Sequence, residues 1–400
     1  MKRTLIAIGM CLVVRASMAQ TLYVNLENDA VMDYLDEVSY AYSTESQVAQ
    51  YLQDGVRLDI PRPAELPIPE TTAEKVTVTY SEMIDFSDCL TQETPVSEGV
   101  VRIYNLIPER VYFYKMEADD KVLMQGEIKT TGRVRMIYVP TAFNIRDMGG
   151  WETEDGNVIK YGKIYRGAEL NGSIQTSEED LATLRQLGIE AEIDLREATE
   201  NDGAGISAFG FTADDNTYLF TNNSGCCDRS HLTGYSWTQR YRKEFEFIVK
   251  CLQEGRPVYQ HCISGADRTG LLAFLLEGLL GVSYENMMKD YELTSFYKLR
   301  TKNNVDFAYE YINSLNGETL QDKFKYYFTN RLYVSQANIN YFINEMLEPK
   351  VLVGITDLTP STPTTTPKAI YDLQGRRINN STKGIRIEAG KKSLPLAPSN

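Results

Sequence analysis

Residues 258–270 read Val-Tyr-Gln-His-Cys-Ile-Ser-Gly-Ala-Asp-Arg-Thr-Gly, and the apolar run Leu-Leu-Ala-Phe-Leu-Leu follows directly. This order predicts a buried strand, a tight loop and a helix. Unpaired amides at the start of the helix converge on the loop, and the helix dipole adds positive potential there. The stretch therefore predicts an anion site in which successive amides hold phosphate oxygens.

The side chains of this loop predict nucleophilic chemistry. Cys262 lies at the floor of the predicted site, where positive potential lowers a thiol pKa from about 8.5 to roughly 3.5–7.5. Arg268 can hold two phosphate oxygens in a planar fork, and Thr269 can donate to the sulfur as it leaves. The predicted reaction is attack on phosphorus, a phosphocysteine and its hydrolysis. The predicted phosphate-binding residues are Ile263, Ser264, Gly265, Ala266, Asp267 and Arg268.

The loop resembles the signature of the cysteine-dependent protein tyrosine phosphatases, because His261, Thr269 and Gly270 accompany the Cys-x5-Arg spacing. Three further segments, 144–150, 165–170 and 194–196, stand in the order seen in the bacterial tyrosine phosphatases that include secreted, lipid-active members. Residues 290–294 also resemble that group. The resemblance covers roughly residues 134–350. It implies a protein tyrosine phosphatase that needs no cofactor and acts on a phosphorylated protein or a small phosphomonoester.

The residues around the loop predict an α/β domain at 133–352 with a central, mostly parallel sheet and flanking helices. Strands are expected at 134–139, 163–166, 191–195 and 257–261, and helices at 177–187, 237–254 and 269–280. The reactive loop then lies at the carboxyl end of a central strand, where open α/β sheets place their sites.

Two aspartates are candidates for the general acid. Asp267 lies inside the loop; it either holds loop amides in place or protonates the leaving oxygen and later activates water. The resemblance implies activity for an aspartate at this position, and no Trp-Pro-Asp acid loop is recognisable. Asp228, thirty-four residues before Cys262, is the rival. His261 ends the strand, so its side chain is expected to point away from Cys262 and to support the loop from behind.

Charged residues of the resembling segments are Arg146, Asp147, Arg166 and Arg196. They form either buried ion pairs that brace the loop or contacts to a further phosphate of the substrate. The lipid-active relatives usually have lysine before the loop aspartate, where this chain has Ala266. This difference favours phosphotyrosine over phosphoinositides or inositol polyphosphates, which stay the alternative substrates.

Composition excludes several other functions. The net charge of −14 argues against general nucleic-acid binding, which depends on a basic face. Two histidines in the whole chain provide no histidine-rich metal site, and no metal is predicted.

A cysteine protease using Cys262 and His231 would leave Arg268 without a role. A pseudophosphatase that only binds phospho-ligands is the alternative of another class, and the intact loop argues against it.

The first nineteen residues predict a signal peptide, with a basic start, an apolar run at 5–14 and small residues before position 20. The mature protein is expected to be exported, without stable membrane insertion. Removing the signal leaves five cysteines, an odd number. Adjacent Cys226 and Cys227 are expected to be poor disulfide partners for each other.

Residues 20–132 predict an accessory β-sandwich, with strands at 75–80, 99–103 and 110–116 and a possible helix at 41–53. The segments 104–108, 111–114 and 126–131 resemble the end of a fibronectin type III-like domain. Residues 353–368 predict a Pro/Thr linker. The tail at 369–400 resembles the short C-terminal modules of exported Bacteroidetes proteins. No oligomeric state is predicted.

Overall fold

The computed structural model of the chain describes residues 20–36 and 57–350, and four short strands between residues 370 and 393. The chain forms two compact units, residues 1–352 and residues 353–400, and we describe each by itself. The predicted signal peptide at 1–19, the predicted helix at 41–53 and the predicted linker at 353–368 lie outside the described residues.

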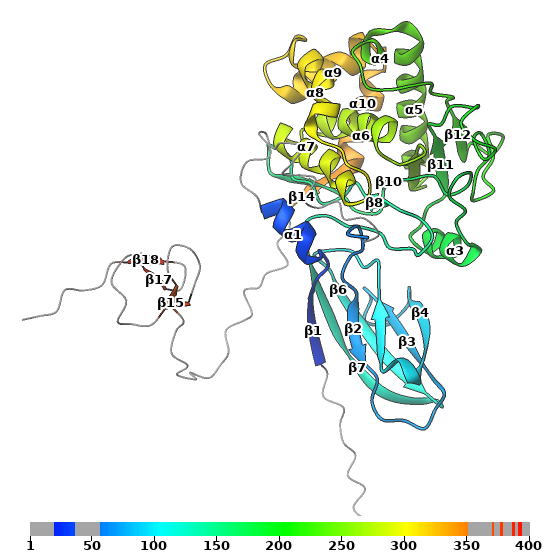
Figure 1. Ribbon diagram of the computed structural model, residues 1–400, viewed down its shortest axis with the longest axis vertical. Helices are drawn as coiled ribbons and strands as arrows, with labels where there is room; N and C mark the ends of the chain where they lie inside the picture. The colour runs from blue at the N-terminus through cyan, green and yellow to red at the C-terminus, as the bar shows by residue number, and fades with distance from the viewer. Residues whose placement is uncertain are drawn as a thin grey trace, which may run out of the picture. The chain divides into compact units, whose positions relative to one another are not determined.

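The first part of the larger unit consists mainly of strands, drawn in blue to cyan in Figure 1. These strands are β1 (Gln20–Asn25), β2 (Ala64–Pro67), β3 (Lys75–Ser81), β4 (Leu90–Pro95), β5 (Val100–Ile103), β6 (Val111–Ala118) and β7 (Lys121–Thr131). Five of them form a sheet in the order β1-β7-β6-β3-β4, and β2 pairs with β5. The strands predicted at 75–80, 99–103 and 110–116 are therefore confirmed.

The five-stranded sheet and the β2-β5 pair share one hydrophobic core. Val78 of β3, Ile103 of β5 and Tyr114 of β6 belong to the same buried cluster. Along β6, buried residues alternate with half-buried ones over all eight positions, as expected for a strand with one face on a core. The alternation of apolar and polar residues along each strand thus determines which of its two faces packs against the core.

Helix α1 (Asp29–Asp36) packs on a different core from the strands that flank it. Its buried residues Val31, Tyr34 and Leu35 belong to the hydrophobic cluster of the α/β part of the chain. The hydroxyl of Tyr34 donates to the carbonyl of Lys289 over 3.1 Å. A segment expected within the accessory domain therefore contributes to the core that carries the candidate site.

The second part of the larger unit contains a five-stranded sheet in the order β12-β11-β13-β10-β8. Its strands are β8 (Arg146–Asp147), β10 (Ile164–Gly167), β11 (Ala191–Asp194), β12 (Tyr218–Phe220) and β13 (Val258–His261). Four of the strands are parallel, and the edge strand β8 is antiparallel to β10. A separate pair joins β9 (Asn157–Ile159) to β14 (Leu347–Pro349).

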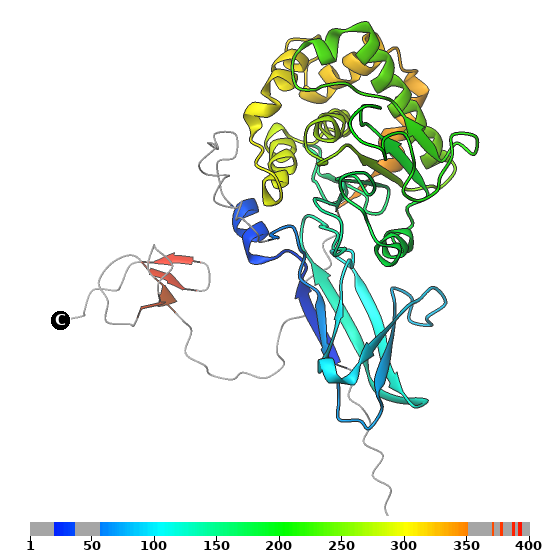
Figure 2. The same cartoon turned by 45° about the vertical axis from the view of Figure 1, so that its right-hand side comes forward.

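Helices surround this sheet, as the two views in Figures 1 and 2 show. The helices are α3 (Glu178–Gln186), α4 (Ser230–Thr233), α5 (Tyr235–Gln253), α6 (Asp267–Leu280), α7 (Tyr284–Glu292), α8 (Asp306–Asn313), α9 (Leu320–Asn330) and α10 (Gln336–Met346), with 3-10 turns η2 (Val96–Glu98), η3 (Leu293–Phe296) and η4 (Lys302–Asn304). The mostly parallel sheet with flanking helices confirms the predicted α/β class of this part.

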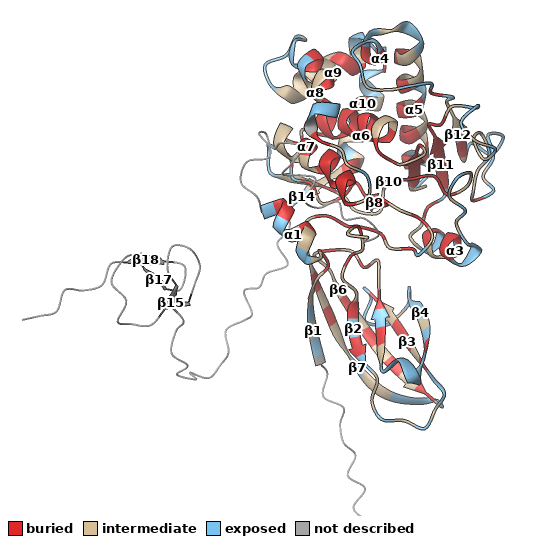
Figure 3. Cartoon of the chain, viewed as in Figure 1, coloured by how far each residue is buried: buried red, intermediate tan, exposed pale blue. Residues whose placement is uncertain are grey.

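Helix α6 is the centre of the α/β core. Every residue from Thr269 to Leu280 is buried, and Figure 3 shows the helix almost entirely in the colour of buried residues. A helix that is buried on all sides requires neighbours on all sides, which β10, β13, α7, α9 and α10 provide. Gly281 ends it in the left-handed conformation, with φ of 87°. The reactive loop is thus attached to the most enclosed element of this core.

One predicted strand differs from the structure. Residues 134–139 form no strand in this part of the chain and make a single bridge, from Met136 to Arg146. Val134, Ile137 and Val139 are nevertheless buried. The apolar pattern correctly predicted that residues 134–139 are largely buried. The segment pairs with β8, however, and this strand has only two residues, so the pairing stops at one bridge and no ladder forms.

The smaller unit contains a four-stranded antiparallel sheet in the order β16-β15-β17-β18. Its strands are β15 (Ile370–Tyr371), β16 (Arg377–Ile378), β17 (Arg386–Glu388) and β18 (Lys391–Ser393). Among the described residues of both units, no helix has the length and apolar character that crossing a membrane requires.

Candidate active site

The reactive loop runs from the end of β13 to the start of α6. Cys262 directly follows the strand, and the helix begins at Asp267. Gly265 has φ of 65°, and a Cβ atom on it would collide with the backbone of Gly167 at the end of β10. Because glycine alone fits this close approach, the loop can curl tightly over the end of the sheet. The amides of the loop then lie at the N-terminus of a buried helix, as the sequence predicts.

Cys262 is a buried thiol, and its side chain belongs to the α/β core cluster. Burial by itself raises its pKa, but the positive charge of Arg268 and the hydroxyl and amide of Thr269 outweigh burial and hold the pKa below its ordinary value. The Thr269 hydroxyl is buried and makes no hydrogen bond to another described residue, so it is available to donate to the sulfur. The arrangement favours the thiolate, the form that acts as a nucleophile.

Arg268 is held by contacts from two further loops. Its Nη1 donates to the carbonyls of Leu195 and Asn223, over 3.1 and 2.9 Å. Glu200 binds both Nη atoms, each at 2.7 Å, so carboxylate and guanidinium face each other as two planar forks. These contacts fix the direction in which the guanidinium points.

Glu200 is a site residue that the sequence reasoning missed. It lies 68 residues before Arg268 in the chain, four residues after the segment Asp194-Leu195-Arg196. Glu197 precedes it on the same turn-rich stretch, and nothing in the local pattern distinguishes the two carboxylates. The one signal in the sequence that could have indicated Glu200 is its closeness to Asp194-Leu195-Arg196, a segment that resembles the bacterial phosphatases.

Asp267 is engaged by Arg300, another residue that the sequence analysis did not single out. Arg300 Nε and Nη2 donate to the two carboxylate oxygens over 2.5 and 2.6 Å. The hydroxyl of Tyr291 donates to Oδ1 over 3.3 Å. Burial tends to raise the pKa of Asp267, but Arg300 outweighs it and holds this pKa below its ordinary value. In this structure Asp267 is therefore a carboxylate, the form that accepts a proton.

Asp228 lies on the loop that follows β12, with its side chain 67% exposed. It accepts from the amide and the hydroxyl of Ser230, which lower its pKa, and it lies 3.1 Å from His231 Nδ1. The described contacts place Asp228 at the start of α4. They do not join it to Cys262 or Arg268, although Asn223 of the same loop contacts Arg268.

The same loop contains a disulfide between Cys226 and Cys227. The expectation that these adjacent cysteines are poor partners is therefore wrong for this structure. The backbone accommodates the small ring because Cys227 adopts φ of 83°, in the left-handed region. Cys89, Cys251 and Cys262 are free thiols.

His261 lies beneath the loop, fully buried, as a support of the reactive cysteine. Its Nε2 is 2.8 Å from Glu192 Oε1 on the neighbouring strand β11, and its Nδ1 is 3.2 Å from the carbonyl of Cys262. Burial lowers the pKa of His261, but Asp194 and Glu192 outweigh it and raise this pKa above its ordinary value. A protonated His261 donates from both nitrogens, to the Glu192 carboxylate and to the Cys262 carbonyl.

Arg146 and Arg166 form a buried ion cluster around Asp290 of α7. Arg146 Nε lies 2.9 Å from Asp290 Oδ1, and Arg166 pairs with Oδ2. Arg166 also donates to the carbonyl of Gly265 over 3.2 Å, so the cluster supports the reactive loop directly. Both arginine side chains are at most 1% exposed, which leaves them no access to a substrate. Of the two predicted roles, the geometry fits the bracing one.

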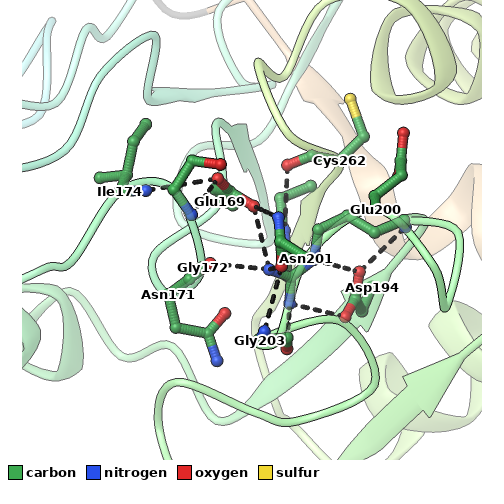
Figure 4. Close-up of polar contacts among 12 residues, drawn as sticks. Glu169, Asn171, Gly172, Ile174, Asp194, Glu200, Asn201, Gly203 and Cys262 are labelled. Carbon is green, nitrogen blue, oxygen red and sulfur yellow. Dashed lines mark hydrogen bonds and ion pairs between the residues drawn. The ribbon is translucent and has the colours of Figure 1, made fainter.

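Three further ion pairs lie around the site. Asp147 pairs with Arg135 at 3.1 Å and accepts from the amide of Gly162. Arg196 pairs with the carboxylates of Glu169, in the loop after β10, and Asp194, at the end of β11. Figure 4 shows both of these carboxylates among the polar contacts drawn there. Since a buried charge is tolerated only with a partner, these pairs fix the loops that carry them.

Ser264 connects the reactive loop to two neighbouring segments. Its carbonyl accepts from Asn144 Nδ2 over 3.0 Å, and its hydroxyl lies 3.3 Å from Lys298 Nζ. Lys298 was also missed, since it lies 34 residues after Ser264 in a segment without a motif. The structure thus adds a lysine and a second arginine to one side of the predicted site.

A thiol of lowered pKa beside an arginine, under the amides of a helix N-terminus, is the arrangement of the cysteine-dependent phosphatases. Comparison with known proteins agrees with this class. Residues 137–348, more than half of the chain, match the tyrosine phosphatase family, and the chain therefore belongs to that family.

Two relatives illustrate the similarity. A Cupriavidus necator protein named "Putative tyrosine-protein phosphatase" is 28% identical over an alignment of 166 residues, and the match covers 38% of this chain and 60% of that protein. Triple specificity protein phosphatase PtpB of Mycobacterium tuberculosis is 29% identical over an alignment of 192 residues, and the match covers 38% of this chain and 67% of that protein. This chain thus spans 60% of the length of the first of these relatives. The crystal structure of TpbA from P. aeruginosa matches 42% of this chain and 88% of its own, with 15% identity and a TM-score of 0.28.

Proposed function

We propose that this protein hydrolyses phosphomonoesters through a phosphocysteine on Cys262, with phosphotyrosine as the leading substrate. The observation that carries the proposal is the buried Cys262 thiol, whose pKa is held below its ordinary value by Arg268 and Thr269 at the N-terminus of α6. Membership of the tyrosine phosphatase family supports it.

In the first step the Cys262 thiolate attacks phosphorus, the S–P bond forms and the bond to the leaving oxygen breaks. Arg268 and the amides of residues 263–268 stabilise the charge on the equatorial oxygens, because they are already oriented before the reaction. Glu200 and the two carbonyls that contact Arg268 hold it in that orientation. The leaving oxygen receives a proton from an acid or from water.

In the second step water attacks phosphorus, the S–P bond breaks and Cys262 leaves as a thiolate. Asp267 is the proposed base, because its pairing with Arg300 keeps it ionised and able to accept the proton of water. The hydroxyl of Thr269 beside the sulfur stabilises the departing thiolate.

The acid of the first step is assigned to Asp267 as well, with Asp228 as the rival. Asp267 must gain a proton to act in this way, which requires that substrate binding loosens its pair with Arg300. Asp228 is exposed and its loop contacts Arg268 through Asn223, so a movement of that loop would be needed to bring it to the substrate.

Phosphoinositides and inositol polyphosphates are the alternative substrates. Arg146 and Arg166 were the alternative candidates for contacts to additional phosphates, and both are buried against Asp290. The loop has Ala266 before its aspartate. Both observations favour phosphotyrosine. A pseudophosphatase that only binds phospho-ligands is disfavoured, since Cys262, Arg268 and Thr269 are all present and Arg268 and Thr269 lower the pKa of the thiol.

For the rest of the chain we propose export after removal of residues 1–19. Residues 20–132 would then form a fibronectin type III-like sandwich that acts as an accessory domain, and residues 369–400 a C-terminal module of the kind found on exported Bacteroidetes proteins. Two sheets that share one core support the sandwich assignment.

Phosphate release by the reduced protein tests the proposed function. The substrates are p-nitrophenyl phosphate, a phosphotyrosine peptide, a phosphoserine peptide, phosphoinositides and phytate, each with EDTA present. We expect turnover that is highest for the phosphotyrosine peptide and is abolished by Cys262→Ser. Equal release by Cys262→Ser would remove the phosphocysteine from the mechanism, and no release by either protein would favour the pseudophosphatase.

A further inference from the structure

Two cationic side chains around the reactive loop are paired with carboxylates, and a third is not. Arg268 is paired with Glu200, and Arg300 is paired with Asp267. Lys298 is exposed and has no carboxylate partner among residues 20–36 and 57–350. Its Nζ is instead 3.3 Å from the hydroxyl of Ser264, a residue of the reactive loop. The charge of Lys298 acts on Asp267, but within the described part of the chain it forms no ion pair, so its exposed ammonium is accessible to a negative group from outside.

The position of Lys298 is fixed by its neighbours on both sides in the chain. Tyr297 stacks on Phe143, with ring centroids 5.2 Å apart and an angle of 17° between the planes. Arg300 makes two hydrogen bonds to Asp267. Lys298 thus lies on a short segment attached at both ends, and its charge contributes to the lowered pKa of Asp267.

The stacked rings of Phe143 and Tyr297 adjoin the same part of the reactive loop as Lys298. Asn144, next to Phe143, donates to the carbonyl of Ser264, while Lys298, next to Tyr297, contacts its hydroxyl. Both rings are partly exposed, and the guanidinium of Arg57 covers Phe143 at 4.4 Å from the ring centroid. An aromatic surface and an unpaired cation therefore adjoin the reactive loop on its Ser264 side.

We propose that Lys298 and the Phe143–Tyr297 pair form a specificity subsite for phosphotyrosine peptides with an acidic side chain next to the phosphotyrosine. This proposal rests on the proposed phosphatase activity. The rings provide an apolar face for a peptide, and the ammonium attracts a carboxylate that binds beside the phosphate. A polyol ring with several phosphates would instead require several cations around the loop, and the other arginines there are paired or buried.

The test compares two phosphotyrosine peptides of equal length, one flanked by Asp and Glu and the other by Asn and Gln. The quantity measured is the ratio of their kcat/KM values, so that any general effect of a substitution on catalysis cancels. We expect a preference for the acidic peptide of about two- to fivefold, the size of a solvent-exposed ion pair, that declines at high salt. Lys298→Gln should remove the preference, and Lys298→Glu should reverse it.

Lys121→Gln is the matched control, because Lys121 is an exposed lysine at the turn between β6 and β7 and should leave the ratio unchanged. The same ratio is measured as peptide binding in the Cys262→Ser background, which tests the subsite even without turnover.

A ratio that Lys298→Gln does not change overturns the proposal. If that variant loses activity only towards inositol phosphates, the subsite binds a second phosphate and the peptide assignment is wrong. Absence of turnover by the wild type, with the binding ratio intact, would contradict the proposed hydrolysis alone.

Discussion

Glu244 of α5 allows a prediction about stability whose size follows from the structure. Its side chain is fully buried, and burial raises its pKa from 4.5 to about 7. The amide of Asn223 donates to Oε1 over 3.0 Å, but Oε2 has no hydrogen-bond partner among the described residues. One hydrogen bond is too little to compensate a buried charge, which explains the direction of the shift.

The pH dependence follows from this raised pKa. In the unfolded chain Glu244 ionises near 4.5, while in the folded protein it keeps its proton up to about pH 7. The folded state therefore binds more protons between these values, and its stability declines as the pH rises through that window. The difference of about 2.5 pKa units, at about 1.36 kcal/mol per unit, corresponds to about 3 kcal/mol lost by pH 8.

Glu244→Gln removes the ionisation and keeps an oxygen that accepts from Asn223. We expect the variant to match the wild type near pH 4.5 and to be more stable by about 3 kcal/mol at pH 8. Urea unfolding at both pH values measures this difference, followed by the fluorescence of Trp151 and Trp237, which both lie in the α/β part. Glu246→Gln, a partly exposed carboxyl on the same helix, is the control and should show little change. An equal effect of Glu244→Gln at the two pH values would refute the reasoning.

Three further predictions concern the reactive loop. Glu200→Gln weakens the hydrogen bonds that orient Arg268 and should cost about 1–2 kcal/mol, or roughly a five- to thirtyfold fall in kcat/KM, without raising the thiol pKa. A raised pKa would mean that Arg268 had moved away. Arg268→Met should raise the pKa of Cys262, seen as slower alkylation by iodoacetamide at pH 6, and an unchanged rate would contradict the cause given for the lowered pKa. Gly265→Ala forces the loop away from Gly167 and should lower kcat/KM by about a hundredfold; full activity would show that the loop tolerates a Cβ.

The reactive loop could be predicted from the sequence because its chemistry is contiguous. Cys262 and Arg268 are six positions apart, and the strand and helix around them have clear patterns. The class of the α/β fold followed from the same alternation. The strand expected at 134–139 shows where pattern alone is insufficient, since burial of apolar residues does not specify a strand partner.

The partners of the loop could not be predicted, because they are distant in sequence and chemically ordinary. Glu200 and Arg300 are 68 and 33 residues from the groups that they bind. A charged residue on a surface loop reads as a solvated side chain until the fold brings an opposite charge to it. Adjacent Cys226 and Cys227 were expected to be poor disulfide partners on general geometry, but the left-handed backbone at Cys227 accommodates the bond.

Helix α1 has a consequence for how this protein can be divided. Val31, Tyr34 and Leu35 fill the core of the α/β part, and Arg57 donates to the carbonyls of Val139 and Ala142 just before the loop that reaches Ser264. Deleting the residues before 133 would remove packing and hydrogen bonds from the α/β part. The β-rich segment is thus not a module that can be transferred alone from one gene to another. Proteins that evolve from this one should keep both parts together.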